Sequence, residues 1–194
     1  MEGSVKEDEP KASTSRWQLA KREVLVSNRW HEYRRDQGRT DFGSDYEYFY
    51  VYKRFGSVCV VPITDDGKIV FVRQYRYLSN EDSLELPGGG CEVSRDPQQA
   101  AALELAEESG YAAKEWQRVG DVLVASGHCT DRMVIFIATG CQPRSGQQLE
   151  ETEAGMSVEL YTPAQAYQLI DDGKISDSLT VAALAIARRH LLKP

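Results

Sequence analysis

The feature that most constrains this chain is a run of three glycines followed by a helix signal, within residues 84–111. Asp96 is a good N-cap, and Pro97 suits the first helical position because that position needs no N–H. Residues 98–109 are rich in Ala, Leu, Glu and Gln, which are strong helix formers. Gly110 can adopt the left-handed conformation that ends a helix. The stretch therefore predicts a glycine-rich loop followed by one helix.

Three glutamates of this helix share one face. Glu104, Glu107 and Glu108 are spaced i, i+3 and i+4, and like charges at that spacing repel each other. One interpretation is a solvated acidic face, which is the usual explanation of a charge run. The other is a divalent-cation site, because Mg²⁺ prefers a few carboxylates, water and substrate phosphates. The glycines at 88–90 let backbone approach a ligand closely, which favours the cation site.

The same stretch resembles the Nudix box, the signature of hydrolases that act on a nucleoside diphosphate linked to another moiety. The residues in register with the box are Gly89, Glu104, Leu105, Glu107, Glu108, Gly110 and Tyr111. The resemblance implies that the Gly88 carbonyl, Glu104 and Glu108 bind Mg²⁺, with Mn²⁺ as an alternative. It also implies that Glu107 supports catalysis.

Composition and charge narrow the class of protein. The length of 194 residues predicts one domain, or one domain with an arm, and the net charge of −7 argues against nucleic acid as a primary partner. Its four cysteines have no spacing typical of a metal or redox motif, and no apolar run is long enough to cross a bilayer. These features predict a cytoplasmic protein that does not bind membranes. The polar residues 1–15 are predicted to be disordered.

Apolar and aromatic runs predict a mixed α/β fold. The expected strands are 17–27, 30–35, 46–54, 57–63, 68–75, 120–125, 133–139 and 156–161, and the expected further helices are 163–172 and 177–192. Residues 36–45 and 142–153 are predicted to be loops. Strands interrupted by helices predict a mixed sheet covered on both sides. The Nudix resemblance likewise implies an α/β/α sandwich, with residues 16–55 as an N-terminal β-strand arm and residues 56–194 as the hydrolase domain.

Arg76 closes the sequence VRQYR, just before the glycine run. A strand arginine can simply face water, but a guanidinium fork also matches phosphate geometry. VRQYR followed by ELPGG resembles the ADP-ribose and nucleotide-sugar pyrophosphatase branch of the Nudix family. That resemblance implies that Arg76 contacts the diphosphate and that Glu85 binds substrate.

Two N-terminal tryptophans suggest how a base is held. Trp17 and Trp30 are either core residues, as tryptophan often is, or exposed stacking platforms, as their polar neighbours favour. In the branch that the chain resembles, two such aromatics sandwich the nucleobase, one from each subunit of a homodimer, and a following arginine reaches phosphate. The resemblance therefore implies a homodimer in which Trp17, Trp30 and Arg35 bind substrate.

An acidic cluster lies before the last strand. Alone it is an acidic loop of no function, but its position resembles the loop that supplies the catalytic base in this branch. Glu151 and Glu153 are both candidates. The resulting hypothesis is a Mg²⁺-dependent enzyme that hydrolyses ADP-ribose or a nucleoside diphosphate sugar to a nucleoside monophosphate and a sugar phosphate.

The box departs from its pattern at two positions. Arg95 stands where the box has its first glutamate, and Leu103 stands where it has an arginine. These two residues support an alternative, a Nudix-fold module that binds a nucleotide but cleaves it weakly or not at all. The three retained helix glutamates favour the enzyme, because a binding module has no need of their mutual repulsion.

Overall fold

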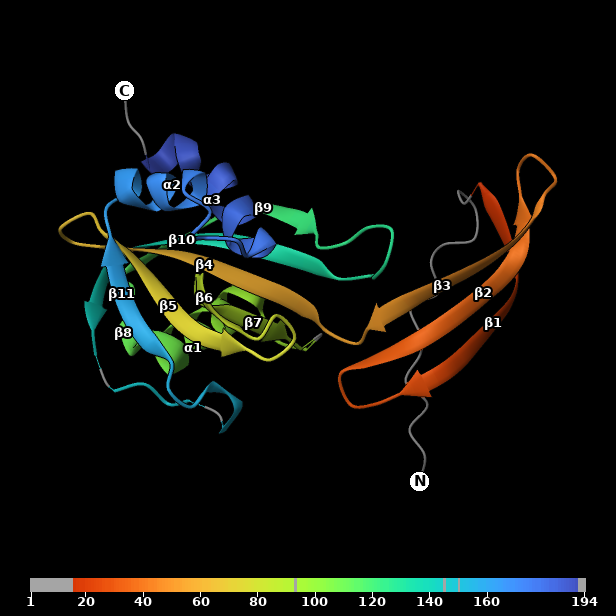
Figure 1. Ribbon diagram of the computed structural model, residues 1–194, viewed down its shortest axis with the longest axis horizontal. Helices are drawn as coiled ribbons and strands as arrows, with labels where there is room; N and C mark the ends of the chain where they lie inside the picture. Colours follow the sequence, from red (N-terminus) through yellow and green to blue (C-terminus); the bar gives the residue numbers. More distant parts are fainter. Residues whose placement is uncertain (1–15, 93, 145, 150, 192–194) are drawn as a thin grey trace. The chain divides into compact units, whose positions relative to one another are not determined.

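A computed structural model describes residues 16–92, 94–144, 146–149 and 151–191. The chain divides into two compact units, Met1–Tyr52 and Lys53–Pro194 (Figure 1). The predicted disorder of residues 1–15 lies outside the described residues. The predicted domain boundary, between residues 55 and 56, stays a prediction.

The first unit is a three-stranded sheet in the order β1-β2-β3. Its strands are β1 (Trp17–Ser27), β2 (His31–Thr40) and β3 (Asp45–Lys53). β1 pairs antiparallel with β2 from Trp17 opposite Thr40 to Ser27 opposite Glu32. The three strands predicted here are confirmed, but β2 is longer than expected.

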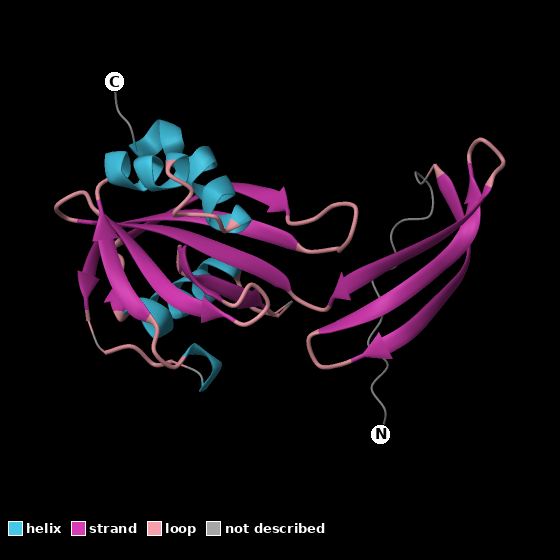
Figure 2. Ribbon diagram, viewed as in Figure 1, coloured by secondary structure: helices cyan, strands magenta, loops and turns pink. Residues whose placement is uncertain are grey.

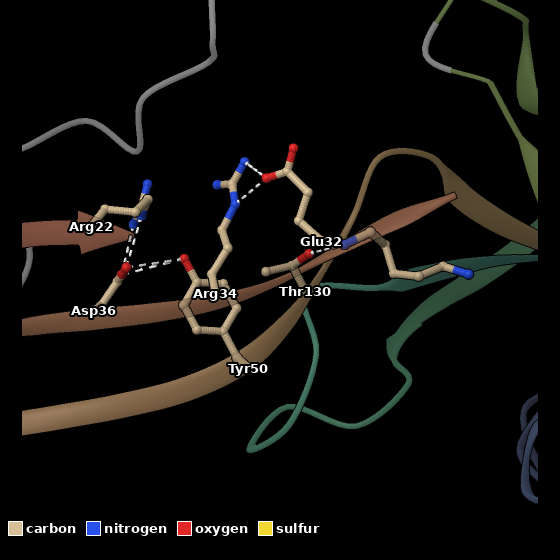
Figure 3. A network of polar contacts seen from close by, with 7 residues as sticks. Arg22, Glu32, Arg34, Asp36, Tyr50 and Thr130 are labelled. Atoms are coloured by element: carbon tan, nitrogen blue, oxygen red, sulfur yellow. Dashed lines mark hydrogen bonds and ion pairs between the residues drawn. The ribbon is translucent and has the colours of Figure 1, made fainter. Parts of the chain in front are cut away.

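The prediction of a loop over residues 36–45 is wrong in its first half, because charged side chains pair across the strands. Asp36 lies opposite Arg22 and accepts two hydrogen bonds from its guanidinium, at 2.9 and 2.8 Å. The Tyr50 hydroxyl approaches the same carboxylate at 3.3 Å (Figure 3). Opposite charges in a cross-strand pair stabilise a sheet without hydrophobic side chains. A polar sequence therefore forms strand here, with one irregularity in the pairing, between Leu19 and Lys21 of β1.

The second unit contains an eight-stranded sheet (Figure 2). Its strands are β4 (Gly56–Thr64), β5 (Ile69–Arg76), β6 (Glu81–Glu85), β7 (Gly88–Cys91), β8 (Tyr111–Ala112), β9 (Glu115–Leu123), β10 (Arg132–Pro143) and β11 (Ser157–Tyr161). The main path runs β11-β5-β4-β10-β8, with β6 on β5, β7 on β4 and β9 on β10. β4 and β10 are parallel and the other pairings are antiparallel, so the sheet is mixed as predicted.

Helices cover both faces of this sheet (Figure 1). They are α1 (Pro97–Ser109), α2 (Pro163–Asp171) and α3 (Ser178–Leu191). Alternate residues of β4 point to opposite sides: Cys59 and Val61 join the apolar cluster under α2 and α3, whereas Val58 and Val60 join the cluster under α1. The predicted α/β/α sandwich is confirmed. In the described part of the chain, no helix combines the length and apolar character that crossing a bilayer requires.

The helix signal that opens the sequence argument is also confirmed. The Asp96 carboxylate accepts hydrogen bonds from the backbone of Gln98 and Gln99, at 3.0 and 3.1 Å. Pro97 begins the helix, and Gly110 ends it with a left-handed φ of 74°. Each residue has the role that its backbone chemistry predicts.

Two predicted loops are partly strand or helix. The glycines at 88–90 form β7, where Gly88 pairs with Cys59 of β4, because glycine alone allows so close an approach: a Cβ at Gly88 would lie 2.4 Å from the Val58 carbonyl oxygen. Within residues 142–153, β10 continues to Pro143, and Glu151–Glu153 form a short 3-10 helix.

Candidate metal and substrate site

Strand β7 and helix α1 bring glycine backbone against two of the predicted metal ligands. The Gly88 N–H donates a hydrogen bond to Glu108 Oε2 at 2.9 Å. A Cβ at Gly89 would lie 2.5 Å from Glu104 Oε1, so the Glu104 carboxylate rests directly on the glycine backbone. Glycine is therefore required at Gly89 because the Glu104 carboxylate occupies the space of a side chain, and at Gly88 because the Val58 backbone occupies it.

Glu108 is the most perturbed acid of the site. Its side chain is nearly inaccessible, and the residue is 4% exposed. Burial raises the pKa of Glu108 to about 8, the Gly88 N–H opposes this rise, and the charges of Glu104 and Glu153 add to it. Arg76 lowers the pKa of Glu108, by a smaller amount. Glu104, Glu153 and Arg76 thus all act on the Glu108 carboxylate.

This group of residues fits a hard divalent cation. Carboxylate oxygens are suitable ligands for Mg²⁺ and Mn²⁺, and a cation would offset the negative charges that lie close together around Glu108. Among the described residues, no three Asp, Glu, His or Cys side chains already form a complete ligand set. Mg²⁺ does not need one, because it usually keeps several waters and takes substrate phosphates as ligands.

Arg76 and Glu85 meet across the β5–β6 hairpin. Arg76 Nε donates to Glu85 Oε1 at 2.7 Å, Arg76 Nη2 pairs with Glu85 Oε2, and Gln74 Nε2 lies 3.4 Å from the same oxygen. Glu85 is buried at 6% exposure, whereas half of the Arg76 side chain (51%) faces solvent. The hydrogen bond with Glu85 raises the pKa of Arg76. The geometry favours Glu85 as the residue that holds Arg76, and Arg76 as the one that a ligand can reach.

The two candidate bases lie in one turn of 3-10 helix but in different surroundings. Glu151 is exposed, whereas Glu153 is partly buried and its charge acts on Glu108. Gln147 ties the preceding loop to α1, because its Nε2 donates to the carbonyl oxygens of Glu108 at 2.6 Å and Met156 at 3.3 Å. The geometry favours Glu153 over Glu151 as the catalytic base.

Glu107, the remaining glutamate of α1, lies near its end and contacts the polar loop that follows β10. The Glu107 carbonyl accepts a hydrogen bond from the Gln148 N–H at 2.8 Å, and the residue is partly buried. Its predicted catalytic role stays a prediction. Sequence analysis missed Gln147, because a single glutamine in a polar loop gives no signal of the two carbonyls that it bridges.

Three predicted substrate residues lie in the first unit. Trp17 and Trp30 are 42% and 49% exposed, which a stacking platform requires and a core residue would not show. The Trp17 ring lies 4.8 Å from that of Tyr46, and the Arg29 guanidinium lies 4.2 Å from the Trp30 ring centroid. These contacts leave both indoles accessible.

Arg35 is held by carboxylates of its own sheet. Its Nη2 lies 2.6 Å from Glu23 Oε2, and its Nη1 lies 3.7 Å from Glu47 Oε1. The Arg35 Nε is buried and has no hydrogen-bond partner in the described residues. The predicted phosphate contact of Arg35 stays a prediction.

The two departures from the box lie on the surface. Arg95 is exposed and Leu103 is 40% exposed. The Asp96 carboxylate caps α1.

Comparison with known proteins identifies the second unit. Residues 53–183 match the family described as NUDIX domain. An ADP-ribose pyrophosphatase of Mycobacterium tuberculosis (strain ATCC 25618 / H37Rv) is 33% identical over 135 residues, which cover 69% of this chain and 65% of that protein. The chain therefore spans somewhat less than two thirds of this relative's length.

Other relatives extend the comparison. The methanol dehydrogenase activator of Bacillus methanolicus is 33% identical over 130 residues, covering 66% of this chain and 70% of that protein. The ADP-ribose pyrophosphatase of Bacillus subtilis (strain 168) is 29% identical over 135 residues, covering 69% and 72%. A solved structure of an ADP compounds hydrolase superposes with a TM-score of 0.81 over 91% of this chain and 95% of that chain, at 20% identity. That likeness shows the fold.

Proposed function

This chain belongs to the NUDIX family of hydrolases, and on that premise we propose that it cleaves the diphosphate bond of ADP-ribose or a nucleoside diphosphate sugar. The products are a nucleoside monophosphate and a sugar phosphate. The observation that carries the proposal is the buried Glu108 carboxylate, which is bound by the Gly88 N–H and surrounded by the charges of Glu104, Glu153 and Arg76. Two of the relatives described above are named ADP-ribose pyrophosphatases, which supports the substrate class.

In this proposal, Glu104, Glu108 and the Gly88 carbonyl hold Mg²⁺ or Mn²⁺, with Glu107 in support. When bound, such a metal polarises a diphosphate and lowers the pKa of water. Glu153 accepts the proton of the attacking water, and Glu151 is the alternative base.

Arg76 contributes positive charge for the diphosphate. Because Glu85 is buried and holds the guanidinium on one side, the exposed side of Arg76 is already oriented before a substrate arrives. Preorganised charge of this kind is the main contribution that a protein makes to phosphoryl-transfer reactions. Glu85 thus serves substrate binding through Arg76.

The positions of the tryptophans support a homodimer. Trp17 lies opposite Thr40 at one end of the β1–β2 hairpin, and Trp30 precedes β2 at the other end. At strand spacing the two indoles are roughly 30 Å apart, so one chain cannot place both on the same base. A sandwich of the base by both residues therefore requires two subunits, with Arg35 in the same arm. The free state of all four cysteines supports a cytoplasmic location.

The departures at Arg95 and Leu103 favour a second candidate function, a module that binds the nucleotide and cleaves it weakly or not at all. One assay separates the two. Purified protein is incubated with ADP-ribose and with ADP-, UDP- and GDP-sugars, with and without Mg²⁺, and the products are separated by anion exchange. Metal-dependent release of a nucleoside monophosphate is expected with the wild type and not with Glu108→Gln. Binding of these nucleotides without any product would establish the second candidate and overturn the first.

A further inference from the structure

The first turn of α3 contacts the short connection between β6 and β7. The Leu86 N–H donates a hydrogen bond to Thr180 Oγ1 at 3.0 Å, across 94 positions of sequence. Thr180 is 1% exposed and Leu86 is 5% exposed. Water therefore has no access to this hydrogen bond.

Thr180 accepts a hydrogen bond from the single backbone N–H of this connection. Leu86 and Pro87 alone separate the two strands. Pro87 has no N–H, and its carbonyl oxygen accepts a hydrogen bond from the Val60 N–H at 2.9 Å. Leu86 has the only N–H of the connection, and a buried N–H that loses its partner is costly. The Thr180 hydroxyl thus fixes the position of the Leu86 backbone.

The connection carries a functional residue at each end. Glu85, the last residue of β6, holds Arg76 through two hydrogen bonds. Gly88, the first residue of β7, donates its N–H to Glu108. A shift of the backbone at Leu86 would move both contacts at once, because each lies within two residues. The position of Leu86 therefore links the substrate-binding arginine to the metal-binding carboxylates.

Thr180 itself is held rigidly. Asp177 caps α3: its Oδ2 accepts a hydrogen bond from the Thr180 N–H at 2.7 Å, and its carbonyl oxygen accepts one from Val181 at 3.0 Å. Leu184, one turn further along α3, is fully buried in the apolar cluster on that side of the sheet. The hydroxyl of Thr180 is thus presented from a capped helix that is anchored in the core.

We propose that Thr180 is a positioning residue, whose hydroxyl sets the Leu86–Pro87 connection so that Arg76 and the carboxylates of α1 act on one substrate. This role rests on the proposed function and deepens it. Thr180 touches neither the metal nor the substrate in this account. It acts through the Leu86 N–H, on Gly88 in one direction and on Glu85 in the other.

Three full-length variants test this role. Thr180→Val keeps the shape of the side chain but removes the acceptor, and Thr180→Ser keeps the acceptor. Leu184→Val is the matched control, because it weakens the core one turn along the same helix and keeps the Thr180 hydroxyl as acceptor. Each protein is measured for Leu86 amide hydrogen exchange by NMR, for Mn²⁺ affinity without substrate by electron paramagnetic resonance, and for kcat and KM with ADP-ribose.

In Thr180→Val, faster Leu86 exchange, roughly tenfold weaker Mn²⁺ binding and roughly tenfold lower kcat are expected, from the loss of one buried hydrogen bond. Thr180→Ser should restore all three to within about twofold of wild type. Leu184→Val should lower the melting temperature and leave Mn²⁺ affinity unchanged. If Thr180→Val does not fold, Thr180→Cys replaces it, since a thiol sulfur is a weak acceptor.

Wild-type Mn²⁺ affinity and kcat in Thr180→Val, with only a lower melting temperature, would make Thr180 an ordinary core residue and overturn the proposal. Equal loss of Mn²⁺ affinity in Leu184→Val would overturn it too. A wild type that binds Mn²⁺ but hydrolyses no nucleotide would refute the proposed function alone. The effect of Thr180 on Mn²⁺ affinity and on Leu86 exchange would still decide its positioning role.

Discussion

The two units of this molecule are stabilised in different ways. Among residues 16–52, all of which the structure describes, no hydrophobic side chain is buried, and the buried residues are Glu32 and Arg34. In the second unit, apolar clusters fill both sides of the sheet. A three-stranded sheet with no covered face is only marginally stable in water. The first unit therefore has the properties of an arm that needs another surface, whereas the second is complete in itself.

Because the arm has no hydrophobic core, charged and aromatic contacts stabilise it instead. Arg34 donates to Glu32 at 2.6 Å, and its guanidinium lies 3.6 Å from the Tyr52 ring centroid. Arg22 and Asp36 pair across β1 and β2. Meanwhile Val26 is 64% exposed, and the hydrophobic side chains of the arm lie on its surface. These contacts set the pairing of the strands and leave apolar area for binding, which is the arrangement that a shared site would need.

The largest predicted effect tests whether the arm completes a site in a partner subunit, by mixing the variants Trp17→Ala and Trp30→Ala. Trp17→Ala and Trp30→Ala should each raise KM for ADP-ribose by roughly 5- to 150-fold, since stacking one base on an aromatic contributes about 1–3 kcal/mol. Suppose that each site takes Trp17 from one subunit and Trp30 from the other. A dimer of the two variants then contains one site with both tryptophans and one with neither. After subunit exchange, the mixture should recover about a quarter of the wild-type rate at low substrate.

Neither variant alone should recover in this way, and light scattering should give a dimer mass for all three samples. A mixture that stays as slow as its components would show that both tryptophans serve one chain or none. A monomer mass for the wild type at micromolar concentration would remove the shared site altogether. Either result would leave the exposed surface of the arm without the role proposed for it.

Two arginines of β5 in the second unit, Arg76 and Arg73, can be compared directly. Each is paired with a glutamate, Arg76 with Glu85 and Arg73 with Glu159 at 2.5 Å, but they lie three residues apart and so face opposite sides of the strand. Arg76→Lys should lower kcat/KM about tenfold, because lysine keeps the charge and loses the planar fork. Arg73→Lys is the control and should stay within about twofold of wild type. Equal effects of the two variants would remove Arg76 from the site.

The sequence predicted the second unit better than the arm, for a physical reason. Capping residues and hydrophobic periodicity depend on local chemistry, so Asp96, Pro97 and Gly110 marked the ends of α1 correctly. The apolar runs at 57–63 and 68–75 likewise predicted the strands β4 and β5. Contacts between distant residues were not predictable in this way.

The failures share one cause. The glycines of β7 are strand because of β4, residues 36–40 are strand because they pair with β1, and Thr180 meets Leu86 across 94 positions. Each depends on a partner that periodicity within a segment cannot identify. The exposed tryptophans were predicted from polar neighbours, but their separation along the hairpin was not.

The buried acid of the second unit predicts that stability depends on pH. The pKa of Glu108 rises from its usual 4.5 to about 8 on folding. Below pH 4.5 the group is protonated in both states and has no effect. As pH rises from 4.5 to 8, the unfolded chain ionises first, so the metal-free protein should lose a few kcal/mol of stability, at about 1.4 kcal/mol per pH unit of difference.

Thermal unfolding in EDTA, followed from pH 5 to 8, measures this effect. Glu108→Gln should flatten the decline, and its melting temperature at pH 8 should exceed that of the wild type by several degrees. Mg²⁺ should offset the decline in the wild type and not in the variant. Glu115→Gln, an exposed glutamate of β9, is the control and should follow the wild type. A variant with the same decline as the wild type would place the responsible group elsewhere.

The smallest predicted effect concerns the two departures from the box, which test whether the second unit is as complete as its core suggests. Arg95 lies just before the first turn of α1, where the helix dipole favours an anion, and Asp96 already occupies that turn as the cap. Leu103 adjoins Glu104 and cannot brace it as an arginine would. We expect the two residues to compensate, because a glutamate at 95 would lack its charge partner while position 103 is leucine.

A double-mutant cycle on kcat at saturating Mg²⁺ measures this compensation. Arg95→Glu and Leu103→Arg should each lower kcat or leave it unchanged, whereas the double variant should equal or exceed the wild type. The resulting coupling free energy is expected to be about 0.5–1 kcal/mol, the lower part of the range for residues that interact. The effect is small because both positions are exposed, and solvent screens the charges of a glutamate at 95 and an arginine at 103. Additive single effects would mean that the two positions act independently, and the departures would then be unrelated changes at the surface of an otherwise intact site.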